Sequence, residues 1–208
     1  MHQDLVDKVC ALDGNRIRVL AAGVVLIAVL SAGVASCLVP DDAPALLVGE
    51  SVASDFRLLA EETWTDFLAA FRARVDCFGP VTLQATRTLD SRAVYDPDNA
   101  TVTVRVPATP AMLRGALIHE FAHHVEFQCP EHEDLRPPFL AALGLPAGTE
   151  WRHDPLPKGA PAGKGSDVPS EQYAEATVIL VLGRRQVSTG VWVNEEAVRT
   201  VEVWAAGD

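Results

Sequence analysis

The chain has 208 residues and a formal net charge of -11. Its length suits one domain plus a targeting segment and is too short for two full domains. Its hydrophobic fraction of 49% is ordinary for a globular protein, so a core can be buried. Acidic and basic residues cancel within segment 1–37, so the negative charge lies after Cys37. Since so acidic a domain repels phosphate backbones, we expect no nucleic-acid partner.

Segment 19–39 is an uncharged, apolar run near the N-terminus. Its 21 residues suffice to cross a hydrocarbon core about 30 Å thick. Arg16 and Arg18 precede the run, and acidic residues follow it. This charge asymmetry predicts that residues 1–18 are cytoplasmic and that the chain after Pro40 is exported.

Three kinds of N-terminal segment share this pattern. A single-pass anchor fits the length, because a secretion signal has an apolar core of only about 7–15 residues. Residues 34–37 (Val-Ala-Ser-Cys) resemble a bacterial lipobox, which would make Cys37 the lipidated residue, although Leu38 is not the small polar residue expected next. A cleaved secretion signal is the third interpretation. All three predict a domain outside the cytoplasm, held at the cell membrane by an anchor or a lipid, or secreted.

Residues 45–208 are expected to form one domain. Apolar residues recur at intervals of three and four where helices are expected, and alternate with polar residues where strands are expected. The expected helices cover 54–75, 110–127, 137–145, 169–182 and a last segment after Asn194, and the expected strands cover 81–89, 93–95 and 101–106. A loop rich in Pro and Gly covers 155–169. Because helices precede and follow the strands, we expect an α+β fold with a short sheet.

Local signals mark the starts of four of these helices. Ser54, Thr109 and Asn194 are of the types that cap helix N-termini. Pro110 directly follows Thr109, and Pro169 opens another apolar pattern. Pro is favoured in the first turn of a helix, so both positions predict helix starts.

His119, Glu120 and His123 form an H-E-x-x-H pattern within the expected helix 110–127. Residues four apart lie on one helix face, about 6 Å apart along the axis, so both imidazoles can bind one Zn2+ at about 2.0–2.1 Å. Glu120 projects beside the metal, where it can act as a general base on zinc-bound water. The alternative is a solvated helix face without a metal. His124 points about 100° away, so we expect it to pack or to support its neighbours.

A catalytic zinc ion needs three protein ligands and one open position. The third ligand is expected from the helix 169–182, where Glu171 and Glu175 lie on one face. Glu171 can reach the metal, and Glu175 can accept a hydrogen bond from the free nitrogen of a ligand histidine. The alternative is a pair of solvated acids. Other possible ligands are Cys129, His132, His153 and Asp154.

The two motifs together resemble the gluzincin group of zinc metallopeptidases. The local Glu-x-x-Ala-Glu form at 171–175 is similar to that of the anthrax lethal factor family. The resemblance implies that His119, His123 and Glu171 are metal ligands, that Glu120 is the catalytic base and that Glu175 supports a ligand histidine. It covers about the two motif helices, and the interval between them is longer than in thermolysin-like enzymes.

A residue that stabilises the oxyanion is not evident from the motifs. His153 is the first candidate for this catalytic role, and the others are Tyr95, Tyr173 and Lys164. The strand 101–106 directly precedes the zinc helix. As in zincins generally, we expect this strand to line the cleft and to pair with an extended peptide.

Cys77 and Cys129 are the two cysteines expected outside the cytoplasm, where disulfides persist. Each follows the expected end of a helix, so a disulfide between them would tie the zinc helix to the first helix. The alternative is two free thiols.

These patterns predict zinc-dependent hydrolysis of peptide bonds in extracytoplasmic proteins or peptides. One alternative is a non-catalytic zinc-binding envelope protein or lipoprotein that binds a partner, although such a protein would not need Glu120. Another is hydrolysis of a non-peptide amide, such as a cell-wall component. The residues do not indicate the substrate, the oligomeric state or an activating partner.

Overall fold

The computed structural model of the protein describes residues 43–152, 168–184 and 186–207. Within them, four short strands form one mixed sheet in the order β1-β2-β4-β3. The strands are β1 (Leu46–Val48), β2 (Val81–Thr86), β3 (Ala93–Asp96) and β4 (Thr101–Arg105). β1 and β4 each pair with β2 in parallel, whereas β3 pairs with β4 in antiparallel fashion.

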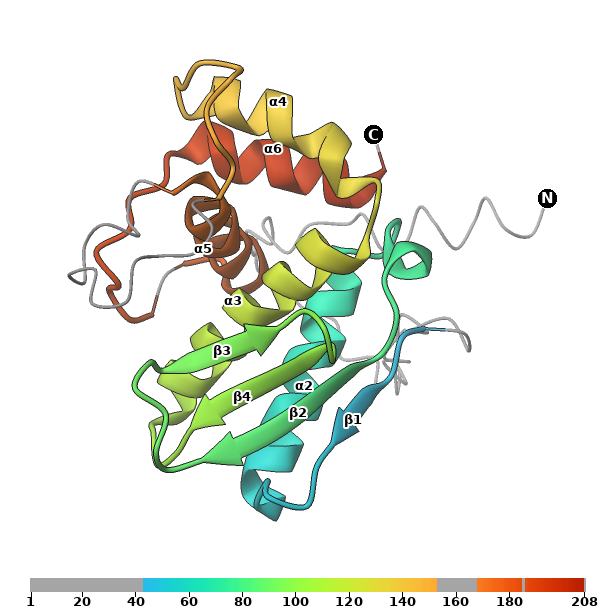
Figure 1. Cartoon of the computed structure of the whole chain (residues 1–208), viewed down its shortest axis with the longest axis vertical. Helices are drawn as coiled ribbons and strands as arrows, with labels where there is room; N and C mark the ends of the chain where they lie inside the picture. Colours follow the sequence, from blue (N-terminus) through green and yellow to red (C-terminus); the bar gives the residue numbers. More distant parts are fainter. Residues whose placement is uncertain (1–42, 153–167, 185, 208) are drawn as a thin grey trace, which may run out of the picture. The chain divides into compact units, whose positions relative to one another are not determined.

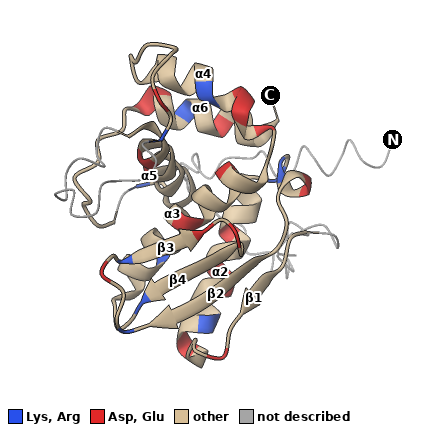
Figure 2. Cartoon of the chain, viewed as in Figure 1, with Lys and Arg blue, Asp and Glu red and all other residues tan. Residues whose placement is uncertain are grey.

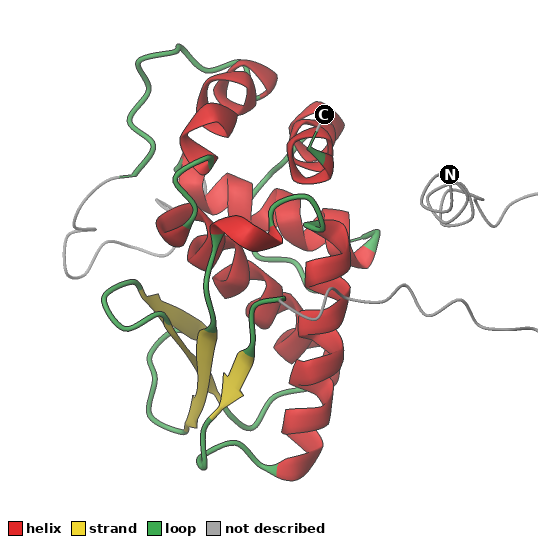
Figure 3. Cartoon of the chain, turned by 90° about the vertical axis from the view of Figure 1, so that its right-hand side faces the viewer, coloured by secondary structure: helices red, strands yellow, loops and turns green. Residues whose placement is uncertain are grey.

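Five α-helices accompany the sheet in the described residues. They are α2 (Ser54–Ala70), α3 (Pro110–Gln128), α4 (His132–Ala142), α5 (Pro169–Leu182) and α6 (Glu195–Ala206) (Figure 1). The helices lie to one side of the sheet, so the sheet and the helices form separate layers (Figure 3). The expected mixture of helices and strands is therefore confirmed.

One face of the sheet is buried, and the alternation of residues along the strands explains why. In β4, Val102 and Val104 are fully buried, whereas the intervening Thr103 is partly exposed. Val81 and Leu83 repeat the pattern in β2. Successive side chains of a strand point to opposite faces, so these valines and Leu83 all face the helices.

An aromatic cluster fills the space between α2 and α3. Phe67 stacks on Phe71 with ring centroids 4.5 Å apart, and Phe121 of α3 meets Trp64 edge-on at 4.7 Å. Phe78 closes the cluster from the segment before β2. Because Phe121 lies between His119 and His123 on α3, this cluster holds the helix that carries the expected metal ligands.

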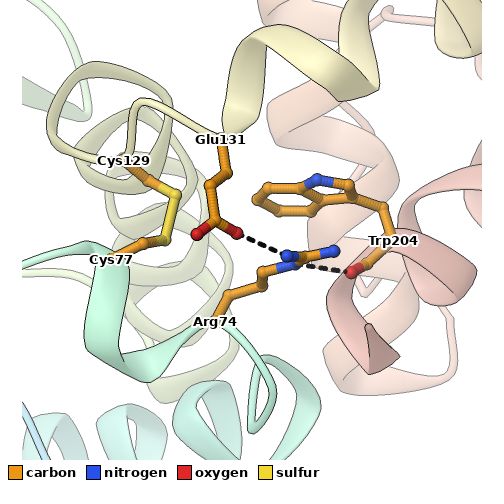
Figure 4. Close-up of a disulfide and its surroundings, with 5 residues drawn as sticks. All are labelled: Arg74, Cys77, Cys129, Glu131 and Trp204. Carbon is orange, nitrogen blue, oxygen red and sulfur yellow. Dashed lines mark hydrogen bonds and ion pairs between the residues drawn. A yellow bond between two sulfur atoms is a disulfide. The ribbon is translucent and has the colours of Figure 1, made fainter. Parts of the chain in front are cut away.

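A disulfide joins Cys77 and Cys129 and ties the chain after α2 to the end of α3 (Figure 4). Beside it, the Arg74 guanidinium forms an ion pair with Glu131 and lies 4.9 Å from the ring centroid of Trp204. The Arg74 Nε also donates a hydrogen bond to the backbone carbonyl of Trp204 at 2.9 Å. The end of α3 is thus connected to α6 as well as to α2.

Most expected helix starts are confirmed. The Thr109 side chain accepts a hydrogen bond from the Met112 amide, and the Asn194 side chain accepts one from the Ala197 amide. Pro169 is the first residue of α5. The expected cap at Ser54 is wrong, because Ser54 is already helical and Ala53 occupies the cap position without a side-chain hydrogen bond.

Several boundaries differ from the expectation, and the structure has one further strand. α2 ends at Ala70 rather than at residue 75, and a short 3-10 turn, Val75–Cys77, follows it. α4 begins at His132, five residues before the expected start at 137, so that two prolines lie inside it. β1 was not expected. It pairs in parallel with β2, and α2 lies between the two strands in sequence. A strand therefore precedes the first helix, whereas the expected order placed all strands after it.

No helix in the described part of the chain is long and apolar enough to cross a membrane. The expected membrane segment 19–39 lies outside the described residues. Its role as anchor, lipoprotein signal or cleaved signal stays a prediction.

Candidate metal centre

The packing of α3 against α5 brings together the three expected metal ligands. His119 and His123 project from one face of α3, and Glu171 lies in the first turn of the facing α5. Both helices carry acidic positions in this region (Figure 2). One potential ligand atom from each of the three residues lies within 4.8 Å of the other two. It is the only such group of three in the described part of the chain.

The two histidine nitrogens and the two oxygens of the Glu171 carboxylate lie close together. His119 Nε2 lies 3.2 Å from His123 Nε2 and 3.2 Å from Glu171 Oε2. His123 Nε2 lies 3.6 Å from Glu171 Oε1. Around an ion bound at about 2.0–2.1 Å, tetrahedral ligands lie about 3.3 Å from one another. The three side chains are therefore close enough to hold a metal ion between them.

Two carboxylates determine which nitrogen of each histidine faces the centre. His119 Nδ1 donates to Glu175 Oε1 at 3.1 Å, and His123 Nδ1 donates to Glu126 Oε2 at 2.9 Å. Each imidazole then presents the lone pair of Nε2 to the centre, because a neutral imidazole carries one proton. Two lone pairs and a carboxylate facing one another repel unless a cation lies between them. The donor set therefore fits a metal ion.

Glu126 is a supporting residue that the sequence analysis missed. Its buried carboxylate accepts hydrogen bonds from His123, the Trp151 indole, Arg152 and the Ser170 hydroxyl. Burial alone would raise the pKa of Glu126, but the hydrogen bond and the charge of His123, together with Arg152, lower it to about 2. Glu126 is thus held as an anion that fixes His123.

Replacing Glu126 with Gln should weaken zinc binding about 10- to 100-fold, because a carboxylate behind a ligand histidine orients the ring and raises its basicity. Competition between the purified protein and a zinc-binding dye measures this affinity. The matched control is Glu133→Gln, at an exposed position of α4, which should leave the affinity unchanged. Equal affinity of Glu126→Gln and the natural protein would remove the proposed support of His123.

Glu120 lies beside the three ligand residues and is 7% exposed. Burial raises the pKa of Glu120, and it outweighs the neighbouring imidazoles and a backbone hydrogen bond from Tyr95, which lower the pKa. A raised pKa brings a carboxylate closer to the neutral range, where a general base is most effective. The pKa of Glu171 shifts in the other direction. Burial raises this pKa, but His119 and His123 together lower it below its usual value.

A cleft of about 960 Å³ opens over these residues. Its described lining comes from residues 91–95 at the start of β3, from α3 and α5, from Arg152 and Val168, and from the segment 186–191. His119, Glu120, His123, Glu171 and Glu175 all line it. A molecule in the cleft would therefore contact both the ligand residues and the candidate base.

The expectation that the strand 101–106 pairs with a substrate is wrong. This strand is β4, which lies between β2 and β3, so both of its edges already pair within the sheet. The edge strand at the cleft is β3. The Arg105 amide bonds the Arg92 carbonyl, and hydrogen-bonded pairs alternate along an antiparallel ladder. Ala93 and Tyr95 of β3 therefore direct their backbone groups away from β4.

The expected oxyanion-stabilising residues lie in three different situations. His153 and Lys164 lie outside the described residues. The hydroxyl of Tyr95 lies 3.0 Å from His124 Nδ1 and accepts a hydrogen bond from Gln128 at 3.1 Å. These contacts hold the hydroxyl against α3. Tyr173 is fully buried and does not line the cleft.

The two alternative ligands within the described residues, Cys129 and His132, are separated from the centre. Cys129 is bound in the disulfide, and His132 is fully buried among Trp151, Tyr173 and Trp204. Asp154 lies outside the described residues. Since Nε2 of His124 also lies 2.9 Å from the Gly79 carbonyl, His124 joins α3 to the chain before β2, as packing or support would require.

Comparison with known proteins adds no relative. No protein-family model, no curated protein and no solved structure matches the chain.

Proposed function

We propose that this protein is a zinc metallopeptidase of the gluzincin type, with a small zincin-like domain that acts outside the cytoplasm. The convergence of His119, His123 and Glu171 is the observation that supports a metal. The Nε2 atoms of His119 and His123 lie 3.2 Å apart, and each lies 3.2 to 3.6 Å from an oxygen of Glu171, which supports a metal between them. Two histidines and one carboxylate are the ligand set of several catalytic zinc sites.

Glu120 is assigned the role of general base. It lies next to His119 in the chain, lines the cleft, and is not one of the three residues that converge on the centre. Zinc, when bound, supplies Lewis-acid activation of water and of the scissile carbonyl. Glu120 takes the proton of the attacking water and transfers it to the leaving amine.

The edge of β3 supports a peptide as the substrate. Ala93 directs its amide and carbonyl away from β4, and both residues 93 and 95 line the cleft. An extended peptide can add to such an edge through main-chain hydrogen bonds. This position would place the peptide backbone beside Glu120, whose carboxylate already bonds the Tyr95 amide.

The test is the zinc content and peptide cleavage of the purified full-length protein, kept in mild detergent because of its apolar segment. The natural protein should bind one zinc ion and cleave a mixed peptide library. Replacing Glu171 with Ala should remove most of the zinc and the activity, since two histidines alone leave the site open.

The controls separate the metal from the reaction. Glu195→Ala, at an exposed position of α6, should retain both zinc and cleavage. Full zinc retention in Glu171→Ala would contradict the assigned ligand. A zinc-loaded natural protein that cleaves no peptide would favour the non-catalytic alternative.

A further inference from the structure

Ser170 is a buried polar residue in the first turn of α5. It is 3% exposed and directly precedes Glu171. Successive residues of a helix lie about 100° apart around its axis, so Ser170 and Glu171 point in different directions from the same turn. Because a buried hydroxyl is normally hydrogen-bonded, the partner of Ser170 shows what holds this turn of α5.

Ser170 attaches the start of α5 to two other segments. Its hydroxyl donates a hydrogen bond to Glu126 Oε2 of α3 at 2.8 Å, and its amide donates one to the Trp151 carbonyl at 3.1 Å. The first amides of a helix have no partner within the helix, and Val168 at the cap position supplies no side-chain hydrogen bond. Ser170 therefore fixes the start of α5 in place of a capping side chain.

The oxygen that accepts the Ser170 hydrogen bond also holds a ligand histidine. Glu126 Oε2 accepts a hydrogen bond from His123 Nδ1 at 2.9 Å, so one carboxylate oxygen connects His123 of α3 with the turn of α5 that carries Glu171. The Glu126 side chain is fully buried and is held as an anion. Hydrogen bonds to an anion are stronger than those between neutral groups, so this connection holds the two helices firmly together.

The hydrogen bond from His119 to Glu175 is a second connection between α3 and α5. It lies at the opposite end of the site, because His119 precedes Glu126 along α3 whereas Glu175 follows Ser170 along α5. Along α5, Glu171 comes between Ser170 and Glu175. The two helices are thus joined on both sides of the turn that carries the Glu171 carboxylate.

We infer that Ser170 is a positioning residue, which holds the Glu171 carboxylate beside the two ligand histidines before the metal binds. This inference rests on the metal centre of the proposed function and names a residue that assembles it. A site that is formed in advance binds more tightly, because less conformational entropy is lost on binding. Without the Ser170 hydroxyl, the first turn of α5 loses its bond to Glu126, and the Glu171 carboxylate is less well fixed.

The test measures the zinc affinity of Ser170→Ala in the purified full-length protein, by competition with a zinc-binding dye. We expect a decrease of about tenfold, because hydrogen-bond partners behind metal ligands contribute about 10- to 100-fold to metal affinity. Ser170→Cys keeps nearly the same size and a weaker S–H donor, so its affinity should be intermediate. The matched control is Thr177→Val, which removes another buried hydroxyl of α5, one that bonds a carbonyl of its own helix. Its affinity should be unchanged.

A double-mutant cycle with Glu171→Ala separates positioning from a general structural role. If Ser170 acts by placing Glu171, Ser170→Ala should weaken zinc binding about tenfold in the natural background and by less than about twofold in Glu171→Ala, where the carboxylate is already absent. A general loosening of the domain, or a change at His123, would weaken the remaining two-histidine site by the same factor as the natural one. A dye of lower zinc affinity extends the measurement to the weaker variants.

The outcomes distinguish this inference from the proposed function. Natural zinc affinity in Ser170→Ala, or an equal loss in the natural and Glu171→Ala backgrounds, overturns the positioning role and leaves the metallopeptidase intact. The expected pattern of affinities in a protein that cleaves no peptide supports the positioning role and overturns peptide hydrolysis. Absence of zinc binding by the natural protein overturns both.

Discussion

Replacing Glu120 with Gln should lower kcat for peptide hydrolysis by about 10²- to 10⁴-fold, the range that a positioned general base contributes. Glutamine has the same shape as glutamate but does not accept the proton of the attacking water. Because Glu120 is not one of the three residues that converge on the centre, the zinc content should stay at one ion per chain. Steady-state cleavage of a fluorogenic peptide and metal analysis of the same sample measure the two quantities.

The control for this variant is Glu202→Gln, an equivalent change at an exposed position of α6, which should retain full activity. Glu120→Gln separates the catalytic role from a structural one, since only kcat should fall and KM should stay nearly constant. If the variant keeps more than about a tenth of the natural rate with zinc bound, another group acts as the base. Loss of zinc in Glu120→Gln would instead assign Glu120 to metal binding.

The parts of the site that could be predicted from sequence depend on local geometry. Two histidines four apart on a helix must lie on one face, whatever the rest of the chain does. The caps at Thr109 and Asn194 also depend on a few neighbouring residues, and both were predicted correctly. The pairing of Glu171 with this face was a hypothesis about two helices, and the packing of α3 against α5 brings the three residues together.

The parts of the site that were not predicted depend on contacts between segments that are distant in sequence. Glu126 lies three residues after His123, a spacing that puts both on one helix face, and this spacing was a signal that could have identified it. Its other partners, Trp151, Arg152 and Ser170, reach it only through the tertiary fold. Thr189 likewise donates to Glu175 from a separate segment, and no sequence pattern indicated that contact.

The sheet shows the same limit. β1 has only three residues, too few for an alternating pattern to be recognised. Because β1 was not recognised, the parallel pairing of β1 with β2, which α2 connects, was not predicted. The order of β3 and β4 depends on which of them pairs with β2, and β4 takes the interior position. β4, which directly precedes α3 in sequence, is therefore not the strand at the edge of the cleft.

The disulfide has a structural role that follows from the segment it encloses. Cys77 and Cys129 are 52 residues apart in sequence, and the loop between them contains β2, β3, β4 and all of α3. Closing a loop of this length reduces the conformational entropy of the unfolded chain. The disulfide therefore stabilises the part of the domain that carries His119, Glu120 and His123.

Replacing both cysteines with Ala should lower the free energy of unfolding by about 4 kcal/mol, the loop-entropy value for a closed segment of this length. Natural domains are stable by only about 5–15 kcal/mol, so this loss is a large fraction of the total. Chemical unfolding followed by circular dichroism measures it, in the presence and absence of a reducing agent. The reductant should destabilise the natural protein to the level of the double variant and leave the double variant unchanged. Equal stability of the two proteins without reductant would show that the remaining contacts, such as those of Arg74 with Glu131 and Trp204, hold α3 in place by themselves.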